Sequence, residues 1–159
     1  MISADLVGVG AALDRLRAMR EAAGSGIARA IAKLGIDLQN DVRQNKLSGQ
    51  VLQARSGSLR QSIAVQIDQS DTAVSATVYS DLDSAAAQEY GFSGTVDVRA
   101  SLRQIKEAFG HPITAETVGV GAYTRRMDLP QRSFLRSALD DMTPDIGASV
   151  EDALRQALR

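Results

Sequence analysis

Two pairs of closely spaced glycines are the first candidates for ligand-binding chemistry in this sequence. Gly8 and Gly10, and again Gly119 and Gly121, have the spacing that opens a dinucleotide-binding loop, whose backbone cradles a pyrophosphate. That loop requires a third glycine, and neither pair has one at the required position. The chain also lacks the glycine-lysine motif of a phosphate loop. The glycine pairs therefore do not predict nucleotide binding.

The titratable side chains give little sign of catalysis. His111 is the only histidine, and Pro112 beside it indicates a turn rather than a positioned base. A serine nucleophile would need the G-x-S-x-G elbow, which is absent. Asp81 and Asp83 have a spacing that suits either a cation or, more simply, the capping of the helix that follows. We therefore expect no enzymatic activity, no cofactor and no metal.

The composition indicates one domain with a thin core. A chain of 159 residues suits a single folded unit, and the absence of cysteine excludes disulfides, thiolate metal sites and cysteine catalysis. Hydrophobic residues make up 44% of the chain, but 24 of them are alanine, and only 4% of all residues are aromatic. Large apolar side chains are scarce, so we expect partner contacts to supply part of the stability.

The charge pattern argues against two classes of partner. Eighteen lysines and arginines are balanced by nineteen aspartates and glutamates, whereas general nucleic-acid affinity needs a basic surface. No uncharged apolar run approaches the roughly 18 residues of a membrane span, and residues 1–5 lack the positive region of a signal peptide. We expect no membrane contact and synthesis inside the cell, while local basic patches remain open.

Apolar residues at helical spacing fill residues 6–47. Leu13, Leu16 and Met19 form one block, and a second block begins at Ile27. Residues 24–26 between them read Gly-Ser-Gly, and a glycine inside a helix costs about 1 kcal/mol relative to alanine. We therefore expect two helices with a break. The pair is either a long arm with a hinge or an ordinary helical hairpin.

The middle of the chain alternates as a β-hairpin does. An ordered loop is expected at residues 46–57 and a short helical turn at 58–61. Residues 62–69 and 73–80 alternate between apolar and polar side chains and are joined by a short polar connection, which predicts two antiparallel strands. Polar residues at 81–84 then offer caps for a helix over 85–90, and Gly91 is expected to end it.

The next segment contains a short internal sequence repeat, which we call the echo. The pattern V-x-V-x-A-x-x-R occurs at residues 96–103 and 118–125, and both copies alternate as strands do. A short helix is expected at 104–109, closed by a turn at 110–112. Either the two strands form a ribbon that presents arginines to a partner, or they are edge strands whose charges discourage aggregation. The arginines concerned are Arg99, Arg103, Arg125 and Arg126.

The last part of the chain predicts two amphipathic helices, one over residues 132–142 and one opened by Pro144. The complete order of elements predicts an α+β fold. In it, long N-terminal helices and the C-terminal helices pack on one face of an antiparallel sheet of about four strands. Within a single domain of residues 1–159, residues 1–47 would form a helical arm, 58–142 the α+β core and 143–159 a C-terminal helix.

Three sequence motifs indicate the function of the chain more specifically than its predicted helices and strands do. Residues 47–63 read LSGQVLQARSGSLRQSI, residues 88–91 read QEYG and residues 129–139 read LPQRSFLRSAL. In this order they resemble the R-[TS]-G-x-L-x-x-S-[IL] signature, the acidic-aromatic-glycine step and the P-x-R-x-F-L-x-x-A-L helix start of one family. That family comprises the small neck and tail-completion proteins of long-tailed bacteriophages, which join head to tail. One departure is the alanine run at 85–87, where the family often has an aromatic residue.

The matched positions also have architectural interpretations. Glycine permits a positive φ or a tight exit from a helix, and leucine and isoleucine four residues apart bury together. We expect Leu59, Ile63, Phe134, Leu135 and Leu139 to form the core. The full set of motif positions is Arg55, Gly57, Leu59, Ser62, Ile63, Glu89, Tyr90, Gly91, Pro130, Phe134, Leu135 and Leu139.

The resemblance implies a non-enzymatic virion structural protein at the head–tail junction, of the neck, tail-completion or tail-terminator type. It implies a homo-oligomeric ring of six or twelve subunits around the DNA channel, in contact with neighbouring neck and tail proteins and without sequence-specific binding of the DNA. The location would be the virion, after synthesis in the cytoplasm of the host bacterium.

Two hypotheses concern the arginines of the echo. In the first, Arg99, Arg103, Arg125 and Arg126 form part of the subunit interface and meet acidic groups such as Asp37 and Asp41 on the next helical arm. In the alternative, they make the chain a nucleic-acid-binding module, although no aromatic residues are interleaved with them for base stacking.

Overall fold

The computed structural model describes residues 9–53, 57–70, 72–108 and 111–158. Gly8, Leu6, Arg55, Phe109 and Gly110, which figure in the sequence predictions, lie outside the described residues. The fold is α+β, as the sequence predicts. Its elements are α1 (Val9–Asp41), the π-helical turn η1 (Val42–Lys46), α2 (Ser58–Ser62), β1 (Ile63–Gln69), β2 (Val74–Ser80), α3 (Asp83–Tyr90), β3 (Phe92–Val98), β4 (Ser101–Ala108), β5 (His111–Val120), β6 (Tyr123–Leu129) and α4 (Phe134–Ala157).

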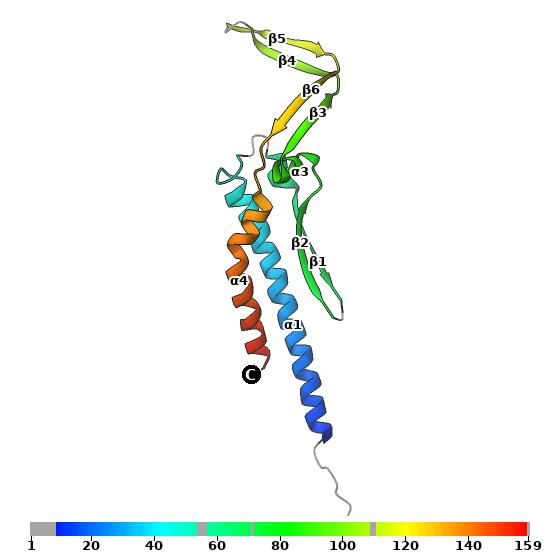
Figure 1. Ribbon diagram of the computed structural model, residues 1–159, viewed down its shortest axis with the longest axis vertical. Helices are drawn as coiled ribbons and strands as arrows, with labels where there is room; N and C mark the ends of the chain where they lie inside the picture. The colour runs from blue at the N-terminus through cyan, green and yellow to red at the C-terminus, as the bar shows by residue number, and fades with distance from the viewer. Residues whose placement is uncertain (1–8, 54–56, 71, 109–110, 159) are drawn as a thin grey trace, which may run out of the picture.

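Helix α1 is the spine of an elongated molecule, with the β1–β2 hairpin along one side and α4 running antiparallel along another (Figure 1). The hairpin pairs antiparallel from Ile63 with Ser80 to Gln69 with Val74, which confirms the two predicted strands. Gly35 allows the hairpin to lie close to α1, because a Cβ atom there would be 2.7 Å from the Cβ atom of Ala76. The other neighbour of α1 is helix α4, which packs on α1 and not on a sheet face, contrary to the sequence prediction.

Helix α1 runs without interruption through residues 24–26, so the predicted break is wrong, and with it both the hinge and the helical hairpin. Two contacts, one within α1 and one with α4, account for the continuity of the helix. The hydroxyl of Ser25 donates to the carbonyl oxygen of Ala22 at 3.0 Å. A Cβ atom on Gly26 would lie 3.5 Å from the carbonyl oxygen of Ala153, so this side of α1 lies against α4. Packing against α4 outweighs the weak helix propensity of glycine.

Helix α4 is likewise a single helix, so the prediction of two C-terminal helices separated at Pro144 is wrong. Pro144 removes one backbone N–H and with it one helical hydrogen bond. The packing of α4 along α1 offsets this loss. The Thr143 hydroxyl, next to the proline, donates to the carbonyl oxygen of Leu139 at 2.9 Å. Tertiary contact again overrides a local helix breaker.

The four later strands form two separate two-stranded sheets, β3 with β6 and β4 with β5, beyond the end of the helical body (Figure 1). We call residues 92–129 the ribbon. The two echo segments do pair antiparallel, but each is divided, with breaks at residues 99–100 and 121–122. The described part of the chain thus has three two-stranded sheets instead of one sheet of about four strands.

The helix predicted at residues 104–109 is wrong as well, because β4 extends through Ala108. Its pairing with β5 satisfies the backbone groups that a helix would have satisfied, with Gln104 opposite Thr117 and Glu107 opposite Pro112. Pro112 is tolerated because each strand of a two-stranded sheet has an open edge. His111 and Pro112 begin β5 rather than forming part of a turn.

The short helices around the core follow the predictions in part. Helix α2 is present where a helical turn was expected, and Gly91 ends α3 as predicted. The predicted side-chain cap of α3 is wrong. Leu82 occupies the N-cap position, and no side chain there bonds to the helix.

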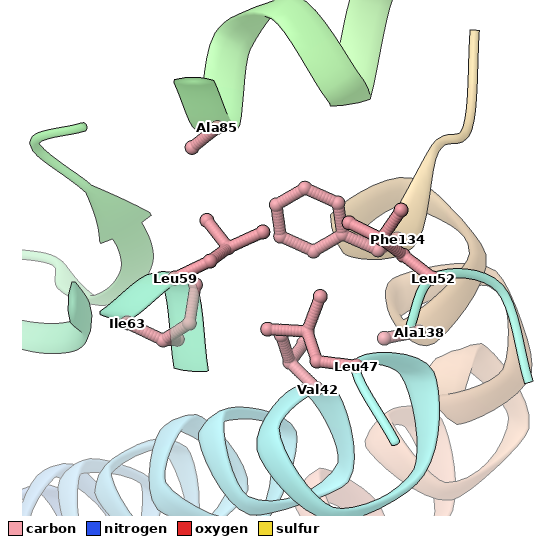
Figure 2. Close-up of a cluster of buried hydrophobic side chains, with 8 residues drawn as sticks. All are labelled: Val42, Leu47, Leu52, Leu59, Ile63, Ala85, Phe134 and Ala138. Carbon is pink, nitrogen blue, oxygen red and sulfur yellow. The ribbon is translucent and has the colours of Figure 1, made fainter. Parts of the chain in front are cut away.

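The core is one small cluster of side chains from η1, the loop that follows it, α2, the start of β1, α3 and α4, with Leu38 of α1 packed against it (Figure 2). Leu59, Ile63 and Phe134 are buried as predicted, and Leu135 packs partly buried against the cluster. Leu139 is 46% exposed, so its assignment to the core is wrong. It lies one residue beyond Ala138, which faces inward in its place. The members are Val42, Leu47, Leu52, Leu59, Ile63, Ala85, Phe134 and Ala138.

Candidate functional site

The described parts of the three motifs meet at the buried cluster, and we call this meeting point the motif junction. Phe134 from the last motif and Leu59 from the first motif are drawn side by side in the close-up (Figure 2). Ala85 of α3, the helix that ends in the second motif, closes the cluster from above in the same view. Motifs far apart in the sequence therefore build one structural unit.

Glu89 joins the second motif to the third. Its carboxylate is buried, with 5% of the residue exposed, and accepts hydrogen bonds from the backbone N–H groups of Leu135, at 2.9 Å, and Arg136, at 3.1 Å. These N–H groups belong to the first turn of α4, where a helix has unpaired donors and a partial positive charge. The Ser133 hydroxyl donates to the carbonyl oxygen of Glu89 at 3.0 Å. Glu89 is thus a cap for α4 supplied from another helix.

Gly91 shapes the turn that leaves the second motif. Its φ is +79°, and a Cβ atom there would lie 3.1 Å from the backbone nitrogen of Gln131 and 3.2 Å from the carbonyl oxygen of Leu129. Beside it, the Arg132 N–H donates to the carbonyl oxygen of Gln88 at 2.7 Å. Only glycine has both the backbone freedom and the small volume that this close approach needs.

The first motif connects α2 to the hairpin. Gly57 precedes α2 with a φ of +72°. The Ser62 hydroxyl donates to the carbonyl oxygen of Leu59 at 2.9 Å and lies 2.7 Å from the Ser80 hydroxyl across the hairpin. The carbonyl oxygen of Ile63 accepts hydrogen bonds from Gln39 of α1 and from Arg43 of η1, so both elements hold the start of β1.

Lys46 is a buried cation that the sequence analysis did not single out. Its residue exposure is 7%, and its Nζ atom lies 2.5 Å from Oδ2 of Asp141 in α4. The partners are 95 positions apart in sequence, so no local pattern could reveal the pair. It ties the end of the long helical arm to α4 next to the motif junction.

The β3–β6 sheet has two different faces, because partners across an antiparallel pair point to the same side and successive residues alternate. One face, which we call the apolar face, consists of Phe92, Gly94, Val96, Val98, Tyr123, Arg125, Met127 and Leu129. The other face, which we call the polar face, consists of Ser93, Thr95, Asp97, Thr124, Arg126 and Asp128. A hydrogen bond of 2.7 Å from Thr124 to Asp97 runs along the polar face.

The four arginines named as interface residues are all exposed, but they do not form one patch. Arg125 and Arg126 point to opposite faces of β3–β6, Arg103 lies in β4, and Arg99 lies at the break between the sheets. Arg103 shares a face with its cross-strand partner Val118. The structure therefore separates side chains that the repeated sequence pattern had grouped.

The two acidic candidates on α1 differ in availability. Asp37 is exposed and lines the groove between α1 and α4. Asp41 is half-buried, and its Oδ1 atom accepts a hydrogen bond of 2.6 Å from Asn45. Asp37 is thus the better placed of the two for contact with another molecule.

The first turns of α1 form a second exposed surface. They extend past the end of α4 and past the tip of the hairpin (Figure 1). Every described residue from Val9 to Ala22 is exposed, including Leu13 and Leu16, at 48% and 62%. The apolar stripe predicted for the helical arm is therefore present but uncovered at this end.

The described residues contain no cluster of three or more histidine or acidic side chains able to hold a metal ion. Within the same ranges, neither long helix has an apolar stretch sufficient to cross a membrane. Comparisons with protein-family models, with curated proteins and with solved structures found no match for this chain.

Proposed function

We propose that this chain is a structural protein of the virion of a long-tailed bacteriophage. Within that class we propose a place at the head–tail junction, as a neck, tail-completion or tail-terminator protein. The observation that carries the proposal is the set of three motifs in order at residues 47–63, 88–91 and 129–139, which resembles this family of joining proteins.

The contacts of the motifs support the proposal. Gly57, Glu89 and Phe134, one from each motif, all serve this junction, because the first precedes α2, the second caps α4 and the third fills the core. None of these roles involves catalysis. The motifs therefore describe a scaffold, as a resemblance to assembly proteins requires.

We propose that the chain acts as a homo-oligomeric ring, with six subunits because tails are sixfold and twelve as the alternative. Head-to-tail contacts close into rings and need two different surfaces on each subunit. The ribbon offers one such surface, and the long helices α1 and α4, which extend away from it toward the other end of the molecule, offer the second (Figure 1).

The direct test is to assemble virions without this chain and to examine them by negative-stain electron microscopy. The expected result is separate heads and tails, with joined particles restored by the wild-type chain. Joined, infectious particles in its absence would contradict the proposal.

The predicted role of the arginines has its own test. A variant with Arg99, Arg103, Arg125 and Arg126 all replaced by glutamate should fold but fail to enter tails. If the folded variant enters tails and heads still join, the ribbon arginines are not part of the interface. Binding of short DNA duplexes by the wild type, with a clear dependence on salt, would favour the nucleic-acid alternative instead.

A further inference from the structure

The apolar face of β3–β6 is an unusual surface for a sheet of only two strands. Phe92, Val96, Val98, Met127 and Leu129 are half-buried, and the ring of Phe92 lies over Gly94. In the described part of the chain, β3 and β6 pack chiefly against each other, and no helix covers this face. Two-stranded sheets are marginally stable in water without such cover.

The chain's own helices cannot supply the cover. Strand β6 leads into α4 through residues 130–133, and from this point the ribbon and α4 extend in opposite directions (Figure 1). A helix that covers the apolar face must therefore come from another molecule.

Helix α4 has the properties that such a cover needs. Leu139, Ile146, Val150 and Leu154 are spaced by seven, four and four residues, which places them along one side of the helix, and we call them the outer stripe. Leu139 and Leu154, at its ends, are 46% and 37% exposed, and Ile146 and Val150 between them are half-buried. The outer stripe is thus an apolar surface of a length comparable to the apolar face.

The charges favour α4 over the exposed start of α1 as the helix that covers the apolar face. Residues 139–154 include five acidic side chains and no lysine or arginine, whereas the exposed start of α1, residues 9–22, carries three arginines and two acids, and one of these acids, Asp14, pairs with Arg17. The only charge on the apolar face is Arg125. That guanidinium would be attracted more strongly to the acidic segment of α4 than to the mixed charges at the start of α1.

Asp140 is the best placed acid on α4. It follows Leu139 directly, at the flank of the outer stripe, and it makes no ion pair among the described residues. By contrast, Asp141 pairs with Lys46, and Glu151 and Asp152 pair with Arg155. Asp145 is also without an ion pair among the described residues, but at about 100° of rotation per residue it lies farther around the helix from the outer stripe than Asp140 does.

We propose that the apolar face of β3–β6 docks on the outer stripe of α4 in a second copy of this chain, with Arg125 facing Asp140. The contact joins two different surfaces and is therefore head-to-tail, so it gives the proposed ring, on which this inference rests, a specific interface. It assigns the acidic side of that interface to α4 instead of to Asp37 and Asp41, and among the four ribbon arginines it assigns the basic side to Arg125 alone, because Arg126 lies on the opposite face.

A charge exchange tests the pairing, with self-association of the full chain measured by sedimentation equilibrium. Arg125→Glu and Asp140→Arg should each weaken association by about tenfold, and the double variant should recover it. Arg126→Glu is the matched control, because it makes the same change one residue away on the polar face, and it should associate as the wild type does. Equal effects of Arg125→Glu and Arg126→Glu, or no recovery in the double variant, would overturn the proposal.

A photo-crosslinking residue at Val96 identifies the occupant directly, with the same residue at Thr95 on the polar face as control. In a mixture of isotopically light and heavy chains, Val96 should crosslink to peptides from residues 139–154 of another copy, in the concentrated protein or in assembled tails. Crosslinks to residues 9–23, to a different protein, or to nothing in both samples would overturn the proposal.

The two proposals fail in distinguishable ways. If heads and tails join without this chain but Val96 crosslinks to α4 of another copy, the proposed function is wrong and the interface stands. If joining requires the chain but the crosslink to α4 is absent, the interface is wrong and the function stands.

Discussion

The motif junction and the ribbon are built by opposite means. At the motif junction, eight hydrophobic side chains from η1, the loop that follows it, α2, β1, α3 and α4 are buried together, and two polar contacts, those of Glu89 and Lys46, join different elements. In the ribbon, backbone pairing between two strands is almost the whole structure, and β5 is exposed along nearly its full length. The difference places the buried core of the described residues at the motif junction, and it is consistent with our proposal that a partner covers the ribbon.

The largest effect should come from the centre of the motif junction. Phe134 is 0% exposed, so Phe134→Ala would leave a cavity and should lower the free energy of unfolding by about 3 to 5 kcal/mol. Chemical denaturation measures this change. Tyr123→Ala in the ribbon, where the tyrosine is 48% exposed, is the matched aromatic control and should cost far less. Similar losses for both variants would remove the distinction between the two regions.

The cap on α4 should give the next effect. Glu89→Ala leaves the N–H groups of Leu135 and Arg136 without their acceptor, and we expect a loss of about 1 to 3 kcal/mol in the free energy of unfolding. Glu89→Gln keeps one carbonyl oxygen and should lose less. Glu116→Ala, at an exposed position of β5, should leave stability unchanged. A Glu89→Ala variant as stable as the wild type would show that the cap contributes nothing.

Two glycines of α1 test the close packing of the helical body. Gly35→Ala places a methyl group 2.7 Å from the Cβ atom of Ala76 and should cost about 1 to 3 kcal/mol. Gly24→Ala meets no atom within 4 Å and should stabilise the chain by up to about 1 kcal/mol, because alanine favours a helix. Thermal melting of the two variants should therefore shift in opposite directions. Shifts of the same sign would contradict the observed approach of hairpin and helix.

The smallest effect on folding is expected in the ribbon. Arg125→Glu and Arg126→Glu change exposed side chains, so each should alter the free energy of unfolding by less than about 0.5 kcal/mol. Their melting curves should overlay the wild-type curve. A large loss for either variant would mean that the ribbon arginines support the fold.

Local sequence patterns predicted the elements whose partners are near in the chain. The hairpin of β1 and β2 alternates over a short connection, and the pairing of the two echo segments follows from their shared pattern. The burial of Leu59, Ile63 and Phe134 could also be expected from their spacing in the motifs.

Long-range packing decided the features that were missed. The Gly-Ser-Gly segment and Pro144 read as helix breaks, yet contact between α1 and α4 keeps both helices continuous. The caps of Glu89 and the pairing of Lys46 with Asp141 join residues 46 or more positions apart, so no local window contains both partners. Residues 104–108 have helix-forming side chains but pair with β5 as a strand.

Amide hydrogen exchange, measured on the isolated chain and on assembled tails, tests the central claim most directly. In the isolated chain, amides of the motif junction should be strongly protected and those of β3, β4, β5 and β6 should exchange quickly, because the strands of the ribbon contact each other but have few contacts with the helical body. In assembled tails, β3 and β6 should become protected while the motif junction changes little. A ribbon that exchanges equally fast in both states would contradict the claim that a partner completes it.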